Sequence, residues 1–370
     1  MTPAMTRVPT AAALKLEPFT GLDGLKASVP AWRTILAETT IDPLCNDPDW
    51  VVAHVEAYAD SKSVFGWTAT DPDGSPVAVF AFKHEPSRGA FRAKRALFAQ
   101  DGSFESDYLD FPVRPGWERA AMQSLLLVLA AKSGVDAVVL HAMDADSKNL
   151  AELRLLLEDA NTPSSEEVVP CAVAALPDSF DDYLAERKKR MRSKIRQAIR
   201  RADEAGATYR WIDDPHELAG ELEGLFALHQ ARWAAIDQPG SFSDERRREF
   251  YARFAPAHLA QGTLKLARMD LDGKAVAYQI GLVAGDRYYQ LQEGYDPAHE
   301  ELRVATGLRA WGVEEMIADG IEHYDFMAGA SKHKSDWGGV DRPCALLAFP
   351  VSPRGRLGFL ARHLARRSSH

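Results

Sequence analysis

Two short stretches of the sequence share one pattern: Asp71-Pro-Asp-Gly-Ser-Pro-Val-Ala78 and Asp270-Leu-Asp-Gly-Lys-Ala-Val-Ala277 both read D-x-D-G-x-x-V-A. Aspartate and glycine between apolar runs are typical of the tight turn of a β-hairpin. One such turn can recur by chance. In this chain each turn is followed, in the same order, by a strand, a loop, a helix and a second strand. We therefore interpret the repeat as an internal duplication.

The apolar periodicity around the two turns predicts alternating helices and strands. In the first half we expect helices at 48–58, 116–133 and 150–157, and strands at 64–70, 77–82, 135–140 and 168–176. In the second half we expect a long helix from about 179, helices at 215–233, 244–259 and 304–318, strands at 208–212, 264–269, 275–283, 287–293, 321–327 and 345–349, and a short basic helix after Pro353. A chain of 370 residues exceeds one ordinary core, which agrees with two domains.

Composition narrows the class of protein. The hydrophobic fraction of 46% and the charged fraction of 26% are those of a globular protein. Residues 1–19 have too short an apolar run for a secretory signal and are expected to be a lead-in, and no stretch has the ~20 apolar residues of a membrane span. Three distant cysteines (Cys45, Cys171 and Cys344) predict buried thiols in a reducing, cytoplasmic compartment, and no Cys/His spacing predicts a metal site.

The net charge of -9 conceals a basic segment. Between Arg187 and Arg201 there are nine Lys/Arg residues and no acid. An apolar stripe (Leu184, Met191, Ile195, Ala198 and Ala202) predicts an amphipathic helix whose charges are solvated. Alternatively, the segment binds an anionic partner, such as the 3′-phosphate of CoA, an acyl carrier protein or a tRNA acceptor stem. The acidic remainder of the chain argues against general binding of nucleic acid.

A family resemblance rests on a series of motifs. They are Leu228-His229-Gln-Ala-Arg232-Trp233, Asp272-Gly273-Lys-Ala-Val-Ala277, Glu293-Gly294-Tyr295-Asp296-Pro297, Gly307-Leu308, Tyr324-Asp325-Phe326-Met-Ala-Gly329, Lys334 and Trp337. Over 179–349 these residues resemble the GNAT acetyltransferases of the CelD/BcsL-like cellulose-biosynthesis group. Tyr108-Leu-Asp-Phe-Pro112 extends the likeness weakly into the first half.

The resemblance implies an α/β fold of two tandem GNAT-like domains, 1–177 and 178–370. Each has a mixed, largely antiparallel sheet flanked by helices. The group is a cousin of the Fem-type aminoacyl-tRNA-dependent ligases, whose long coiled-coil arm requires sustained heptads that are not found here. The second domain is expected to carry the chemistry and the first to act as scaffold and wall of an amine-binding cleft, because no comparable phosphate loop occurs in the first.

The resemblance places an acyl-CoA site, for acetyl-CoA or another acyl-CoA, at the helix that begins near Val304. A helix N-terminus holds phosphate because its unpaired N–H groups and its dipole face the anion. Arg303, Val304, Thr306 and Gly307 are the predicted contacts. The usual phosphate loop is Q/R-x-x-G-x-G/A, whereas Arg303-Val-Ala-Thr-Gly307-Leu has one glycine, so an ordinary helix cap is the alternative. We expect the backbone N–H groups of strand 287–293 to polarise the carbonyl of the thioester.

Transfer to an amine also needs a proton acceptor. Glu293, at the end of that strand, is the first candidate, and His229 and Asp325 are the others. Each candidate also has a structural interpretation. Glu293 is then a solvated carboxylate at a strand end, His229 a core residue, and Asp325 the partner of Lys334 in a structural ion pair. His333 stands where the family more often has tyrosine.

Trp233, Tyr295 and Lys334 are the predicted substrate contacts, with core packing as the alternative for Trp233. The expected function is N-acyl, foremost N-acetyl, transfer from acyl-CoA to a small amine such as an amino sugar or an amino acid. An aminoacyl-tRNA-dependent ligase and a non-catalytic binding module are the alternatives. No G-x-S-x-G, P-loop or G-x-G-x-x-G motif supports another reaction.

Overall fold

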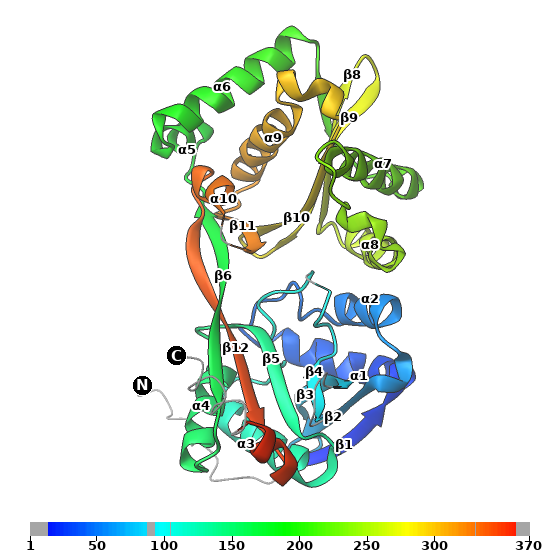
Figure 1. Cartoon of the computed structure of the whole chain (residues 1–370), viewed down its shortest axis with the longest axis vertical. Coiled ribbons are helices and arrows are strands. Elements are labelled where there is room, and N and C mark those ends of the chain that lie inside the picture. The colour runs from blue at the N-terminus through cyan, green and yellow to red at the C-terminus, as the bar shows by residue number, and fades with distance from the viewer. Residues whose placement is uncertain (1–13, 87–92, 104, 330, 360–370) are drawn as a thin grey trace, which may run out of the picture. The chain divides into compact units, whose positions relative to one another are not determined.

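The computed structural model describes residues 14–86, 93–103, 105–329 and 331–359 (Figure 1). The chain divides into two compact units. The first contains residues 1–169 and 344–370, and the second contains residues 170–343. The predicted boundary at 177/178 differs from this division, as does the predicted place of the tail. The tail joins the first unit because Cys344 to Pro350 of strand β12 (Val340–Pro350) pair with β5 (Ala137–Asp144).

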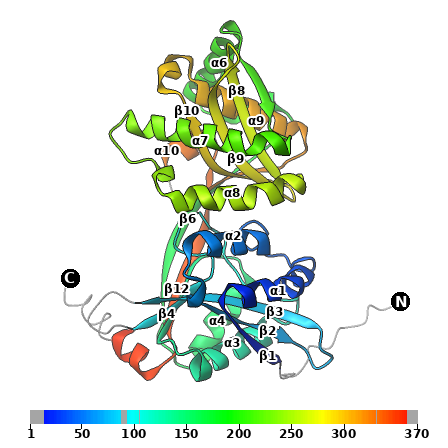
Figure 2. The ribbon, with the colours of Figure 1, turned by 90° about the vertical axis from the view of Figure 1, so that its right-hand side faces the viewer.

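The strands of the first unit follow one another in the sheet in the order β1-β2-β3-β4-β5-β12. Its strands are antiparallel except for β4 and β5, which run parallel. Helices α1 and α2 pack on one face, where Leu25, Trp32 and Val51 meet Val79 and Ala81, and α3 and α4 pack together on the other face (Figure 2). The remaining bounds are β1 Lys15–Thr20, α1 Gly21–Leu36, α2 Pro48–Tyr58, β2 Val64–Thr70, β3 Pro76–Pro86, β4 Lys94–Phe98, α3 Glu118–Lys132 and α4 Lys148–Asp159.

The second unit repeats this plan with the order β6-β11-β10-β9-β8-β7, in which only the β10–β11 pair is parallel among the strands described. Helices α7 and α8 contact β8, β9 and β10, and α6 packs along α9. The bounds are β6 Ser165–Ala175, α5 Phe180–Glu186, α6 Lys189–Glu204, β7 Thr208–Trp211, α7 Pro215–Ala234, α8 Glu245–Ala260, β8 Leu264–Leu271, β9 Lys274–Ala284, β10 Arg287–Tyr295, α9 Val304–Ala318, β11 His323–Ala328 and α10 Lys332–Asp336.

Most predicted elements are confirmed within a few residues, including the hairpins β2–β3 and β8–β9 that hold the repeated turns. The expected lead-in is wrong for Lys15–Thr20, which forms β1 by pairing with β2, and its residues 1–13 lie outside the described part. The long helix expected from 179 is two helices, because Arg187 takes an extended conformation (ψ 147) and ends α5. Strand β4 and helices α1 and α10 were not predicted.

The two parallel strand pairs are short, and this positions the candidate site. β10 pairs with β11 only from Arg287 to Tyr289, and β10 has a bulge between Gln290 and Gln292 where it pairs with β9. Beyond Tyr289 the two strands therefore separate. None of the helices in the part of the chain that the structure describes is long and apolar enough to cross a membrane. All three cysteines are buried, as predicted.

Candidate active site

A cavity of about 420 Å³ lies at the N-terminus of α9 in the second unit. It is lined by the first turn of α9 together with three cations, Lys194, Arg201 and Arg303. The rest of the lining comes from Glu293, Arg232, Tyr295, His333, Glu300 and Glu301. Its volume falls within the range of ligand sites, ~300–1,000 Å³.

The first turn of α9 has unused donors. Its N-cap is Arg303, which adopts a left-handed conformation (φ 58) and forms no side-chain cap. The Thr306 and Gly307 N–H groups bond to the Arg303 carbonyl, while no hydrogen bond to the N–H of Val304 or Ala305 is found among the described residues. Uncapped N–H groups at a helix N-terminus attract anions.

Helix α6 supplies positive charge to the cavity, beside the first turn of α9. Its apolar stripe, Met191, Ile195, Ala198 and Ala202, is buried, which orients Lys194 and Arg201 toward α9. Arg201 donates to the Glu301 carbonyl. Burial lowers the pKa of Lys194, and the charges of Arg303 and Arg309 lower it further, so this ammonium would gain from an anion nearby.

Glu293, which also lines the cavity, lies between two arginines. Its carboxylate accepts from Arg309, which is 3% exposed, and from Arg232 at 3.0 Å. Burial acts to raise the pKa of Glu293, but the charges of Arg309 and Arg232 outweigh it, and the pKa lies below its ordinary value. Glu293 is therefore ionised at neutral pH.

His333 is held beside this ion pair. Arg309 donates to its Nε2. Since arginine is only a donor, Nε2 must be the unprotonated nitrogen, and in neutral His333 the proton is on Nδ1. Burial and the charge of Arg309 lower the pKa of His333 to about 4, so the ring is neutral above that pH.

His229 and Trp233 of α7 pack behind the cavity and do not line it. The Trp233 Nε1–H donates to His229 Nε2 at 3.1 Å, which occupies the lone pair that a base would use. Burial lowers the pKa of His229 to about 4. The His229 backbone lies against Gly294, where an added Cβ would be 2.5 Å from its nitrogen, and this close crossing brings Arg232 beside Glu293.

Asp325 and Lys334 also lie outside the lining of the cavity. Asp325 is fully buried, forms ion pairs with Arg287 at 3.2 Å and Arg342 at 3.9 Å, and accepts from the Met327 N–H at the bulge of β11. Lys334 donates to the Phe326, Met327 and Ala328 carbonyls. These contacts support structural roles, and the predicted Asp325–Lys334 pair stays a prediction.

The structure thus brings together half of the predicted residues: Glu293, Tyr295, Arg303, Val304 and Thr306 line one cavity. Gly307 faces the other way, toward Tyr209 and Ala198. Sequence reasoning missed Arg309 as the partner of Glu293. The signal was an arginine between two apolar residues, Leu308 and Ala310, which are both buried.

One group of three potential metal ligands occurs among the described residues: the side chains of Asp286, Glu322 and His323. They lie at the start of β10 and β11, whereas the cavity lies at the far end of β10.

Comparison with known proteins gives the same fold. Residues 189–335 match the family model described as "Acetyltransferase (GNAT) domain". This part of the chain is therefore similar to GNAT acetyltransferase domains. That match contains every residue that lines the cavity. A search of curated proteins found no match.

Solved structures extend the likeness to both units. The crystal structure of FemX is 11% identical with a TM-score of 0.61, over 90% of this chain and 96% of that chain. A conserved protein of unknown function from Bacteroides thetaiotaomicron is 15% identical with a TM-score of 0.56, over 87% and 97%. At these identities the likeness concerns the fold alone. The fold is that of tandem GNAT-like domains, as the sequence predicted, and the CelD/BcsL-like group stays a prediction.

Proposed function

We propose that this protein is an N-acyltransferase that moves an acyl group, foremost acetyl, from acyl-CoA to the amine of a small molecule. The observation that carries the proposal is the arrangement of one cavity. An uncapped helix N-terminus with three cations and an ionised carboxylate line the same cavity. The helix N-terminus suits the phosphates of a thioester donor, and the carboxylate suits the amine that accepts the acyl group.

The donor's pyrophosphate fits the first turn of α9. The Val304 and Ala305 N–H groups supply unused donors, and Lys194, Arg201 and Arg303 supply charge. We assign polarisation of the thioester carbonyl to the backbone of β10 beyond Tyr289, where the strand bulges and no longer pairs with β11.

Glu293 is the predicted base that lines the cavity, whereas His229 and Asp325 do not. Its lowered pKa makes it a weak proton acceptor, so we assign it the task of attracting and orienting the protonated amine. The amine releases its proton to water and attacks the carbonyl carbon. The C–N bond forms, the C–S bond breaks, and the leaving thiolate takes a proton. The neutral His333, which carries its proton on Nδ1, can donate a hydrogen bond to that thiolate.

Calorimetric titration of the full chain with acetyl-CoA and CoA tests the donor site. We expect micromolar binding to the wild type and at least tenfold weaker binding to Arg201→Ala. Arg246→Ala is the matched control, because Arg246 is an exposed arginine of α8 that pairs with Asp244 outside the cavity. Failure of CoA and of longer acyl-CoAs to bind the wild type would overturn the acyl-CoA proposal.

An amine screen that detects release of free thiol then tests the reaction. Because Glu293, His229 and His333 all have pKa values below the neutral range, the rate between pH 5.5 and 8 is expected to follow only the pKa of the amine. An additional protonation step with a pKa of about 6.5 that persists with amines of different pKa would show that another group is the base.

A further inference from the structure

Helix α6 carries more positive charge than the cavity uses. Lys188, Lys189, Arg190 and Arg196 are exposed, and no acid lies within ion-pair distance of them in the part of the chain that the structure describes. Elsewhere in the second unit, cations such as Arg210, Arg253 and Lys265 are each paired with an acid. Like charges four residues apart destabilise a helix, so a series of unpaired cations lowers the stability of α6 unless an anionic partner compensates for it.

The charges form a strip that leads out of the cavity. Arg190, Lys194 and Arg201 are separated by four and seven residues, so they lie on one side of the helix. Two of them, Lys194 and Arg201, line the cavity beside the first turn of α9. From there the strip continues to Arg190, near the start of α6 and outside the lining. Lys189 and Arg196, seven residues apart, lie on the adjoining exposed side of the helix, also outside the lining.

We propose that α6 docks an acidic acyl carrier protein, which presents the acyl group as a thioester on its phosphopantetheine arm. This proposal rests on the proposed function and names its donor. The arm is a thin chain that could enter the cavity. Its one phosphodiester, at the carrier's surface, would then lie near the cationic strip of α6. The acidic carrier surface is complementary to Lys188, Lys189, Arg190 and Arg196. The transfer is the same: the thioester C–S bond breaks, the amide C–N bond forms, and the arm's thiol leaves.

An RNA partner fits this surface less well. Single-stranded nucleic acid is bound by cations together with aromatic side chains on which the bases stack. Residues 187–204 contain no aromatic side chain. A protein partner needs only complementary charge and shape, so the composition of α6 favours a carrier protein.

The test compares three probes by fluorescence anisotropy and calorimetry on the full chain: labelled acetyl-acyl carrier protein, acetyl-CoA and a labelled tRNA mixture. The variant is Lys189→Glu/Arg196→Glu, whose two residues lie outside the cavity. The matched control is Arg246→Glu/Arg253→Glu on α8. We expect carrier protein to bind the wild type and the control in the micromolar range, at least tenfold more weakly at 300 mM than at 50 mM salt. We expect a loss of at least tenfold in the α6 variant, with acetyl-CoA affinity within twofold of wild type.

The outcomes separate the two proposals. Retained acetyl-CoA binding without carrier-protein binding overturns the docking proposal and leaves the proposed function standing. Tight tRNA binding that depends on Lys189 and Arg196, with no carrier-protein binding, overturns it in favour of an RNA-borne donor. Equal carrier-protein binding by the wild type and the α6 variant shows that another surface is used. If carrier protein binds the wild type and acetyl-CoA does not, CoA is overturned as the donor of the proposed function, whereas the docking proposal stands.

Discussion

Each unit has one short parallel strand pair, and the two units differ in what lies beyond it. In the second unit, β10 and β11 separate after three paired residues, and the cavity lies at the end of β10. In the first unit, β4 and β5 also pair over three residues, but the chain itself then fills the place beside β5. The Leu109 N–H bonds to the Ala142 carbonyl, and the Val79 N–H bonds to the Pro112 carbonyl. The second unit thus keeps a cavity beside β10, whereas in the first unit a loop of the chain bonds along the corresponding part of β5.

A buried carboxylate marks each of these regions, and the partners differ. In the first unit, Asp110 accepts from Ser147 (2.5 Å), Asn149 (2.8 Å) and the Phe111 N–H (2.7 Å), all neutral donors. Burial raises its pKa to about 6, although these bonds act to lower it. In the second unit, Glu293 has two arginine partners and a lowered pKa. Both carboxylates line cavities, of about 200 Å³ for Asp110 and about 420 Å³ for Glu293, and they differ in the charge of their partners.

The largest expected effect is that of Glu293→Ala. Removing the carboxylate leaves Arg309 buried without its partner, and breaking a buried ion pair costs ~3–5 kcal/mol. Urea unfolding should show this loss, and the acyl transfer should fall with it. Glu217→Ala, which removes an exposed partner of Arg210, is the control and should cost at most ~1 kcal/mol. A loss below 1 kcal/mol for Glu293→Ala would show that water reaches Arg309.

The next effect is a pH dependence that belongs to the first unit. The pKa of Asp110 is raised on folding from an ordinary value of 3.8 to about 6, so the folded state binds more protons between these values. Its stabilising contribution is therefore complete below pH 3.8 and is lost as pH rises through 6, by on the order of 3 kcal/mol. Asp110→Asn should remove this slope, because an amide can still accept from Asn149 and donate to Ser147. Equal slopes for the two proteins in urea unfolding at pH 4–7 would contradict the assignment.

A smaller effect distinguishes the starts of α9 and α3. Before α3 the positive φ falls on a glycine, Gly116 (φ 86), whereas before α9 it falls on Arg303 (φ 58). A non-glycine residue in the left-handed region costs ~1–2 kcal/mol. Arg303→Gly should therefore raise the free energy of unfolding by ~1 kcal/mol and weaken binding of acetyl-CoA severalfold. Lower stability in this variant would show that the arginine side chain stabilises the turn more than its backbone strains it.

The sequence predicted the repeated hairpins and the helix and strand that follow each of them, because turn chemistry and apolar periodicity are local signals. Of the residues it predicted at the start of α9, Arg303, Val304 and Thr306 line the cavity, and their binding of phosphate stays a prediction. It missed the Glu293–Arg309 pair and the return of β12 to the first unit, because both depend on contacts between distant segments. Strand β4 escaped prediction for another reason: Lys94-Arg-Ala-Leu-Phe98 is too short for its alternation to stand out.

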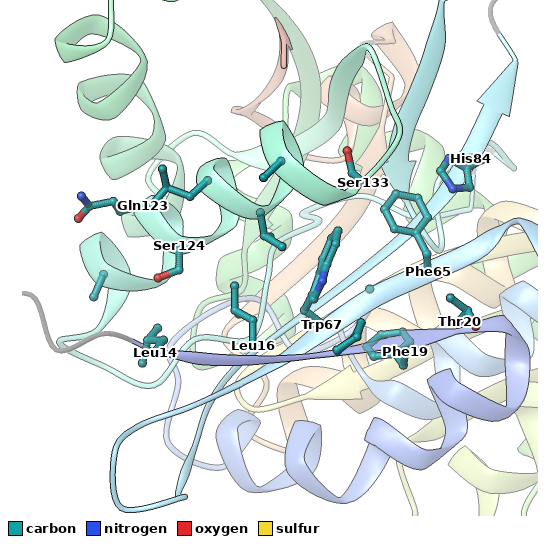
Figure 3. A pocket seen from close by; sticks show the side chains of 16 residues that line it. Leu14, Leu16, Phe19, Thr20, Phe65, Trp67, His84, Gln123, Ser124 and Ser133 are labelled. Carbon is teal, nitrogen blue, oxygen red and sulfur yellow. The ribbon is translucent and has the colours of Figure 1, made fainter. Parts of the chain in front are cut away.

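The last comparison is between the sheet faces beside α9 and α3, and the smallest expected change in stability belongs to the face in the first unit. In the second unit, α6 covers this face, and Ala202 is 0% exposed against Ala267 and Leu308. In the first unit, a groove of about 890 Å³ lies there between α3 and strands β1 and β2, lined by Leu16, Trp67 and Leu127 (Figure 3). Ala202→Gln should cost ~1–3 kcal/mol by overpacking.

Leu127→Gln, by contrast, should change stability by at most ~0.5 kcal/mol in urea unfolding, because Leu127 is 66% exposed. A cost above 1.5 kcal/mol would show that another segment covers the groove in solution, as α6 does in the second unit. Both units would then have this face of the sheet covered, each by a different segment. The separation of β10 from β11 would remain the structural difference between the two units.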